Sequence, residues 1–248
     1  MLEAVKLFGE LLVFAVLIVT VVLAFVMLVL RRLFDMISVL VSVRNDIVIM
    51  MGRDSEDDRA YAAATLGSEA KGILVRRRVA KALIGTLQDT EAPVAVRASA
   101  AGALSEVGYR RGQYVLMSVV ADRSIEKYVR IASMSALSCL GVGLDKVMEI
   151  ALDTSDQEMA QWALLAITRY TKSKNQVISF VRSEIVEDMT IPGTVRDFAA
   201  RVSEVLQNDG EIQPILASIS RNAENDRYVG IMFSILFGQN WKESYGIV

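Results

Sequence analysis

The residue types that most often carry chemistry are scarce in this chain. The 248 residues include no histidine and one cysteine, Cys139. Histidine is the commonest general base and a frequent metal ligand, so a zinc site or a thiol–imidazole pair would lack its usual parts. Catalysis by carboxylates or lysine alone stays open. We therefore expect no enzyme, with no catalytic residue, no metal site and no cofactor.

The densest group of carboxylates is Asp54-Ser55-Glu56-Asp57-Asp58. A metal site is one reading, but nothing in the sequence fixes its geometry. A solvated turn that begins a helix is the reading we favour, since Ser and acidic residues are typical of helix N-termini. No phosphate-binding loop of the G-x-x-x-x-G-K-[ST] type occurs, and Gly141-Val142-Gly143 fits a turn between helices.

The elements that could position any site begin with an apolar run, Leu11 to Leu30, in which Thr20 is the one polar residue. As a helix this run is about 30 Å long, the thickness of a bilayer's hydrocarbon core. A signal peptide would have a basic leader and a small-residue cleavage site, and Arg31-Arg32 stands where that site would be. A buried core helix is the other alternative. We predict a transmembrane anchor over residues 1–32.

Basic residues near the anchor indicate its orientation. Lys6 precedes the run, whereas Arg31, Arg32 and Arg44 follow it. The side richer in Lys and Arg is usually cytoplasmic. We predict a single-pass protein of the cell (inner) membrane with its N-terminus outside and its C-terminal body in the cytoplasm, and the lone cysteine agrees with a reducing compartment.

Residues 33–53 form a predicted juxtamembrane amphipathic helix. Its apolar positions alternate three and four apart, a heptad pattern: Leu33, Met36, Leu40, Val43, Ile47 and Met50. One interpretation is homo-oligomerisation through Leu33–Met50, or docking on a partner's membrane helix. The other is a stalk that packs on its own C-terminal body or lies on the lipid surface.

Internal repeats fill residues 54–248. Four segments align without gaps: VRRRVAKAL (75–83), VRASAAGAL (96–104), VRIASMSAL (129–137) and VRDFAARVS (195–203). DRAYAAATL (58–66), MAQWALLAI (159–167) and YVGIMFSIL (228–236) fit the frame in part. Within this frame the series Arg97, Arg130, Ala160, Arg196 and Val229 has a period of about 33 residues, typical of helical repeats.

Each period contains turn signals and a second amphipathic run. Asp89, Asp122 and Asp188 precede the arginines, and Gly108, Gly141 and Gly238 follow the aligned segments, where a helix end favours Gly. The second runs are Tyr114–Val120, Leu144–Leu152, Gln176–Ile185 and Gln213–Ser220. Two helices per period predict an all-α fold, an α-solenoid of about five helix pairs. We expect the recurring arginine to bond a neighbouring turn or the preceding Asp.

These motifs resemble the HEAT-like repeats of the phycobilisome-lyase type, whose unit carries an Asp, then Val-Arg, then Ala and Ala-Leu. The resemblance covers about Asp54 to Gly238 and is strongest from Asp89 to Gly141. It departs from the pattern at Ala160 and Val229, where the Arg is replaced. The resemblance implies a repeat fold, and the family includes scaffolds, assembly factors and a minority of enzymes. It implies no catalytic residue.

Charge is uneven along the chain. Lys and Arg outnumber Asp and Glu between Glu69 and Arg130, and the reverse holds from Ile131 onward. The candidate contact residues for anionic lipid or a partner are Arg76, Arg77, Arg78, Lys81, Arg110 and Arg111. A solvated helix face is the alternative, and nucleic acid is unlikely as a partner because no aromatic residue interleaves with Arg76–Arg78.

The sequence therefore predicts a membrane-anchored helical-repeat scaffold or accessory subunit that binds proteins in a membrane-associated complex. We expect the helices that begin near Ala95, Tyr128, Glu158 and Thr194 to present the contact face. The tail residues Trp241, Tyr245, Ile247 and Val248 are expected to form either a cap or a docking segment for a partner. The alternative function is an assembly factor or chaperone for a membrane complex.

Overall fold

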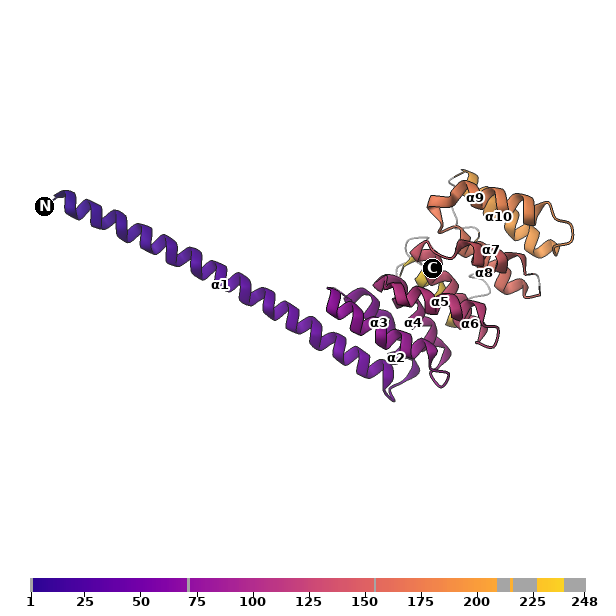
Figure 1. Cartoon of the computed structure of the whole chain (residues 1–248), viewed down its shortest axis with the longest axis horizontal. Helices are drawn as coiled ribbons and strands as arrows, with labels where there is room; N and C mark the ends of the chain where they lie inside the picture. Colours follow the sequence, from indigo (N-terminus) through magenta and orange to yellow (C-terminus); the bar gives the residue numbers. More distant parts are fainter. Residues whose placement is uncertain (1, 71, 154, 209–214, 216–226, 239–248) are drawn as a thin grey trace. The chain divides into compact units, whose positions relative to one another are not determined.

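The computed structural model describes residues 2–70, 72–153, 155–208, 215 and 227–238, with side chains from residue 17 onward except at Ile18, Leu74, Asn208 and Arg227. Every regular element in these ranges is a helix, which confirms the all-α class. The chain divides into two compact units, Met1–Asn45 and Asp46–Val248 (Figure 1). We call the second unit the repeat domain.

Helix α1 (Leu2–Met51) is one continuous helix of 50 residues. The predicted anchor and the predicted juxtamembrane helix are thus a single element, with no break near residue 32. None of the helices, over the residues described with side chains, is long and apolar enough to cross a membrane. Leu11–Val16 and Ile18, which belong to the predicted span, lie outside those residues.

The heptad positions of α1 differ in exposure. Leu33, Met36 and Leu40 are exposed, whereas Val43 is 2% exposed and Met50 is fully buried. The backbone carbonyl of Met50 accepts a hydrogen bond from Arg59 Nε at 3.0 Å. Val43 and Met50 are therefore not accessible for homo-oligomerisation, and the exposed heptad positions end at Leu40.

The repeat domain has two layers of helices. The inner layer consists of α2 (Glu56–Glu69), α4 (Val94–Val107), α6 (Lys127–Leu140), α8 (Gln157–Ile167) and α10 (Gly193–Asn208). The outer layer consists of α3 (Ile73–Gln88), α5 (Arg110–Ala121), α7 (Leu144–Leu152) and α9 (Lys174–Phe180). A 3₁₀ turn, η1 (Thr171–Ser173), precedes α9, and a π-helical turn, η2 (Val181–Val186), continues it.

Packing follows the chain in a regular order. Each inner helix packs on the next inner helix, and each of α3, α5, α7 and η2 packs on the inner helix that follows it. This succession is compatible with an α-solenoid. The described residues contain four inner–outer pairs and α10, whose predicted partner, Gln213–Ser220, lies outside them apart from Ile215.

Small residues allow the inner helices to approach closely. Ala98, Ala101, Ala132 and Ser133 are all buried, and Leu104 fills the space between layers. The helix ends also form as predicted. Gly108 and Gly141 end α4 and α6 in the left-handed conformation, with φ of 63° and 68°, which costs little only for Gly.

Two segments of the repeat frame occupy places that the sequence did not predict. The segment 75–83 lies in α3 of the outer layer, although its motif matches that of inner helices. The segment 228–236 lies in α12 (Arg227–Phe237), which packs against α4 and α6 and does not extend the inner layer beyond α10. The aligned motif is typical of any amphipathic helix with small residues on one face. Both segments match it, although they are not the inner helices of successive repeats.

Candidate functional site

The two layers give the repeat domain two edges with different turns. Ion pairs join the N-terminal ends of successive inner helices, from Arg97 to Glu126 and from Lys127 to Glu158. Because the N-termini of α4, α6 and α8 meet in this way, their C-termini lie together at the opposite edge. We call the first edge the Asp-turn edge, since it carries the turns at Asp89, Asp122, Asp153 and Asp188. We call the opposite edge the Gly-turn edge, since Gly108 and Gly141 lie there.

The four Asp turns share one geometry. In each, the Oδ1 of the Asp accepts the backbone N–H of the residue two positions later. At three of them it also accepts a side-chain hydroxyl, from Ser124, Ser155 and Thr190. These hydroxyl donors, with the backbone N–H of the same residues, hold the pKa of Asp122, Asp153 and Asp188 below its usual value. The turns are therefore structural and stay charged near neutral pH.

The recurring arginine bonds a backbone carbonyl in the last turn of the preceding outer helix, and no hydrogen bond to the preceding Asp is seen at Arg97 or Arg130. Arg97 Nε donates to the carbonyl oxygen of Leu87 at 3.2 Å, and Arg130 Nε donates to that of Val120 at 3.4 Å. Both carbonyls lie ten residues before their arginine, in the last turn of an outer helix. Arg196 departs from the pattern, because its Nη1 contacts Met189 Sδ at 2.7 Å where η2 replaces the regular helix end.

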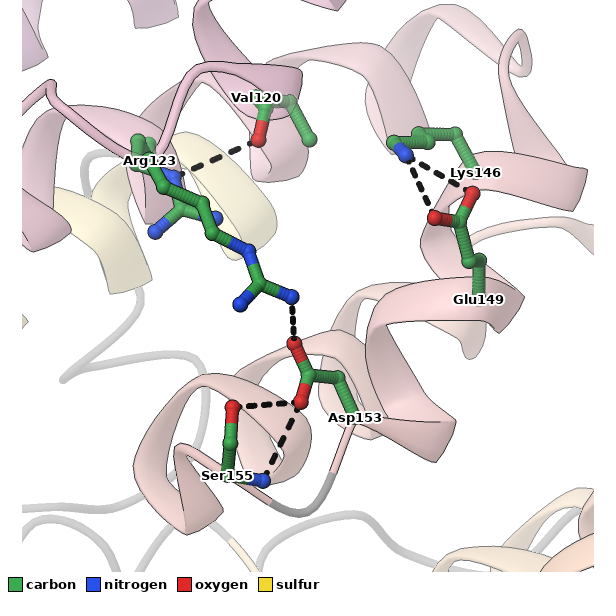
Figure 2. Close-up of polar contacts among 7 residues, drawn as sticks. Val120, Arg123, Lys146, Glu149, Asp153 and Ser155 are labelled. Carbon is green, nitrogen blue, oxygen red and sulfur yellow. Dashed lines mark hydrogen bonds and ion pairs between the residues drawn. The ribbon is translucent and has the colours of Figure 1, made fainter.

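A polar pocket of about 370 Å³ opens at the Asp-turn edge between α5, α6, α7 and α8. Arg123 Nη2 donates to Asp153 Oδ2 at 2.7 Å, and Lys146 Nζ lies 2.8 Å from both carboxylate oxygens of Glu149 (Figure 2). Arg130 also lines the pocket. Both cations and carboxylates line it, so it suits a polar partner surface with charges of both signs.

The carboxylates of this pocket are bonded within the chain. Asp153 and Glu149 pair with Arg123 and Lys146, the Ser155 hydroxyl donates to Asp153 at 2.6 Å, and Asp156 accepts the backbone N–H of Met159. Over the described residues, no three of His, Cys, Asp and Glu are placed to hold a metal ion. The acidic run at the start of α2 acts as a helix start, in which Ser55 accepts the backbone N–H of Asp58.

Helix α12 covers part of the predicted contact face. Its Phe233 is fully buried and packs against Trp162 of α8, with ring centroids 5.4 Å apart. Tyr228 stacks on Tyr128 of α6 at 4.9 Å. A Cβ added to Gly102 of α4 would lie 2.6 Å from Ile235 Cγ1, so the absence of a side chain there admits α12. The expectation that all four inner helices present a contact face is therefore corrected for α4, α6 and α8.

The six candidate contact residues are exposed, and five of them gather at the Gly-turn edge. Arg76, Arg77 and Arg78 lie in the first turns of α3, and Arg110 and Arg111 begin α5. Outer helices run opposite to inner ones, so both N-termini lie at this edge. Lys81 lies farther along α3. Sequence reasoning missed Arg169, Lys172 and Lys174, which follow α8 at the same edge; their basic residue types were a usable signal once the turns were assigned.

Two carboxyl groups at the Gly-turn edge, those of Asp46 and Glu106, have a raised pKa. Burial, followed by the charge and hydrogen bond of Glu69, raises the pKa of Asp46. Burial alone raises the pKa of Glu106, which stands beside Gly67 and lines a shallow pocket with Arg76.

No protein-family model matches this chain, and no curated protein matches it.

Proposed function

We propose that this chain is a membrane-anchored helical-repeat scaffold or accessory subunit, which holds a protein partner in a membrane-associated complex. The anchor is α1, and the repeat domain is the partner-binding body at the cytoplasmic face of the cell (inner) membrane. The HEAT-like resemblance of the repeats supports this class of protein, and the two-layer packing agrees with it.

The observation that carries the proposal is the uncovered apolar surface of α1. Large apolar side chains from Val19 to Leu30 are all exposed, including Phe25 at 66% and Met27 at 68%. An apolar surface this continuous is not tolerated in water without a partner or a lipid phase. Thr20 is the one polar side chain of the stretch. The hydrocarbon core of a bilayer is therefore the environment that best fits this apolar surface.

The pocket at the Asp-turn edge is the partner site that the geometry favours. It presents Arg123, whose side chain is 73% exposed, beside Asp153 and Lys146. Exposed charge pairs of this kind contribute little to the stability of the chain itself, so they are available for a partner with complementary charges. A fixed anchor raises the effective concentration of partners in the same membrane.

Membrane extraction tests the anchor. Membranes that hold the full chain are washed with alkaline carbonate, which releases peripheral proteins. We expect the full chain to stay in the membrane and a variant without residues 2–32 to be released. Release of the full chain would contradict the anchor, and cleavage of the repeats by protease added outside intact cells would contradict the orientation.

Charge reversal tests the scaffold role. A photo-crosslinker at Lys146 should attach one partner at fixed stoichiometry, and Arg123→Glu should abolish that product. A matched control, Arg201→Glu on α10, should leave it unchanged. The assembly-factor alternative predicts a crosslink that appears during biogenesis of the complex and is absent from the mature complex.

A further inference from the structure

Charge in the repeat domain is sorted by edge, which the sequence order conceals. The Gly-turn edge carries basic residues at the start of three outer helices: Arg76, Arg77, Arg78, Arg110, Arg111, Arg169, Lys172 and Lys174. They come from both the basic and the acidic half of the sequence. The C-terminal ends of α6 and α8 lie close together at this edge, because Tyr170 Oη donates a hydrogen bond to the Val142 carbonyl oxygen at 2.7 Å.

The Asp-turn edge carries the opposite charge. Its acidic residues lie in the turns before the inner helices or in the first turn of those helices: Asp54, Glu56, Asp57, Asp58, Asp89, Glu91, Asp122, Glu126, Asp153, Asp156, Glu158, Glu187 and Asp188. Cations at this edge are in part neutralised by these carboxylates, as in the pairs Arg97–Glu126 and Arg123–Asp153. The repeat domain thus has an excess of basic residues at the Gly-turn edge and an excess of acidic residues at the Asp-turn edge. The minority charges are Asp46, Glu69, Glu106 and Asp145 at the first edge, and cations such as Arg59, Arg97 and Lys127 at the second.

The first residue of the repeat domain lies at its basic edge. Asp46, the first residue of the domain, interacts with Glu69 at the C-terminal end of α2. The C-terminal end of α2 lies at the Gly-turn edge, because Gly67 stands against Ala103 and Glu106 near the end of α4. The residues immediately before Asp46 are those that follow the proposed anchor.

Exposed apolar side chains stand among the basic residues. Ile73, at the first position of α3, is 78% exposed, and Tyr114 of α5 is 61% exposed. Arg110 Nη2 lies 3.4 Å from Tyr114 Oη, so the ring and the cation share one face. Basic residues interleaved with a few apolar and aromatic ones are typical of surfaces that rest on lipid headgroups.

We propose that the Gly-turn edge rests on anionic lipid headgroups, which orients the repeat domain with its Asp-turn edge and polar pocket away from the membrane. This inference rests on the proposed function, because it needs the membrane that the anchor supplies. The anionic inner leaflet attracts clustered Lys and Arg close to an anchor. The acidic edge would be repelled by the same surface, so both edges favour one orientation.

The test uses the full chain reconstituted into vesicles of phosphatidylcholine, alone or mixed with phosphatidylglycerol, with nitroxide on some headgroups. Cys139→Ser, which keeps a hydrogen-bond donor to the Ile235 carbonyl, provides the background. A fluorophore is placed on Ile73→Cys at the basic edge or on Met189→Cys, 80% exposed, at the acidic edge. We expect stronger quenching at position 73 than at 189, in anionic vesicles only.

Charge variants complete the test. Neutralising the three arginines, Arg76→Gln, Arg77→Gln and Arg78→Gln, should lower quenching at position 73 to the level seen at 189, as should high salt. The matched control, Arg123→Gln at the acidic edge, should change nothing. Equal quenching at both positions, equal quenching in neutral vesicles, or protection of position 73 by duplex DNA in place of lipid would each overturn the proposal.

The two proposals can fail separately. Flotation of the chain with neutral vesicles reports the anchor, whatever the orientation of the repeat domain. The difference between positions 73 and 189 in anionic vesicles reports the basic edge, whether the chain is held there by α1 or by charge alone.

Discussion

Arg97 and Glu126 join two successive repeats through an ion pair of 2.6 Å whose partners differ in exposure. The Arg97 side chain is 2% exposed, whereas that of Glu126 is 49% exposed. Arg97 also donates from Nε to the Leu87 carbonyl at 3.2 Å, so its buried charge is satisfied from both sides. One side chain thereby ties the end of α3, the start of α4 and the start of α6.

Replacing this arginine should destabilise the repeat domain more than replacing its equivalent in the next repeat. Arg97→Ala removes a fully buried side chain and two hydrogen bonds, and we expect a loss of about 2–3 kcal/mol. Arg130→Ala removes a half-buried side chain with one long bond to Val120, and we expect about 1 kcal/mol or less. Thermal unfolding of the full chain in detergent, followed by circular dichroism, measures both; equal losses would contradict the argument.

Docking of α12 should depend on Phe233 and Gly102. Phe233→Ala removes a fully buried ring that packs on Trp162, and such truncations cost about 3–5 kcal/mol. Gly102→Val would place methyl groups where Ile235 packs, and overpacking costs about 1–3 kcal/mol. We expect faster hydrogen exchange of the α12 amides in both variants. Exchange of the α3 amides should stay as slow as in the unsubstituted chain.

A half-buried neighbour provides the control for that experiment. Phe237→Ala removes a ring of the same size that contacts Phe233 at 6.1 Å but is only partly buried. Its effect on exchange should be clearly smaller. Exchange in α12 that stays unchanged in Phe233→Ala would show that α12 is not held by this contact.

The helices of the repeat domain were predictable where their signals are local. The range Leu144–Leu152 was predicted at both ends, because Gly143 and Asp153 flank an amphipathic run. The Asp and Gly turns follow from residue types that satisfy helix ends within a few positions. For the recurring arginine a local bond was expected, but to a turn or the preceding Asp, whereas the acceptor is a helix carbonyl ten residues before it.

Features that depend on distant contacts were not predictable. The segment 228–236 fits the repeat frame in part, and its place on α4 and α6 depends on distant contacts, such as the space at Gly102 and the ring of Trp162. The charge pattern was also misjudged. The sequence divides into a basic and an acidic half, whereas Arg169 and Lys172 lie in the acidic half yet join Arg76 at one edge.

Acid should weaken the Asp turns. The pKa values of Asp122 and Asp188 are lowered below the ordinary 3.8 by hydrogen bonds from Ser124 and Thr190. A lowered pKa means that the stabilisation is fully present above the unfolded-state value and is lost as pH falls through the folded-state values. We expect the unfolding temperature to be flat with respect to these groups above about pH 5 and to fall in more acidic solution.

The hydroxyl donor can be tested alone at one of these turns. Ser124→Ala should move the pKa of Asp122 back toward 3.8 while that of Asp188 stays low, which carboxyl-carbon NMR titration of the full chain measures. An unchanged Asp122 pKa would mean that the backbone N–H of residue 124 suffices.

Removing the charge of Asp46 should have the opposite pH dependence. Burial, then the nearby Glu69 carboxylate, raises the pKa of Asp46 above 3.8. A raised carboxyl pKa means that the folded state is favoured while the group is protonated, and that this stability is lost as pH rises through the raised value. Asp46→Asn keeps a donor for Glu69 without the charge. We expect it to stabilise the chain at neutral pH by less than about 1 kcal/mol, since the site is partly exposed, and to give no advantage near pH 4.

The control is Asp197→Asn, which changes an exposed carboxyl on α10. It should leave the unfolding temperature unchanged at both pH values. A loss of stability in Asp46→Asn at neutral pH would contradict this argument. It would mean that the Asp46 carboxylate accepts a stabilising hydrogen bond from a group other than Glu69.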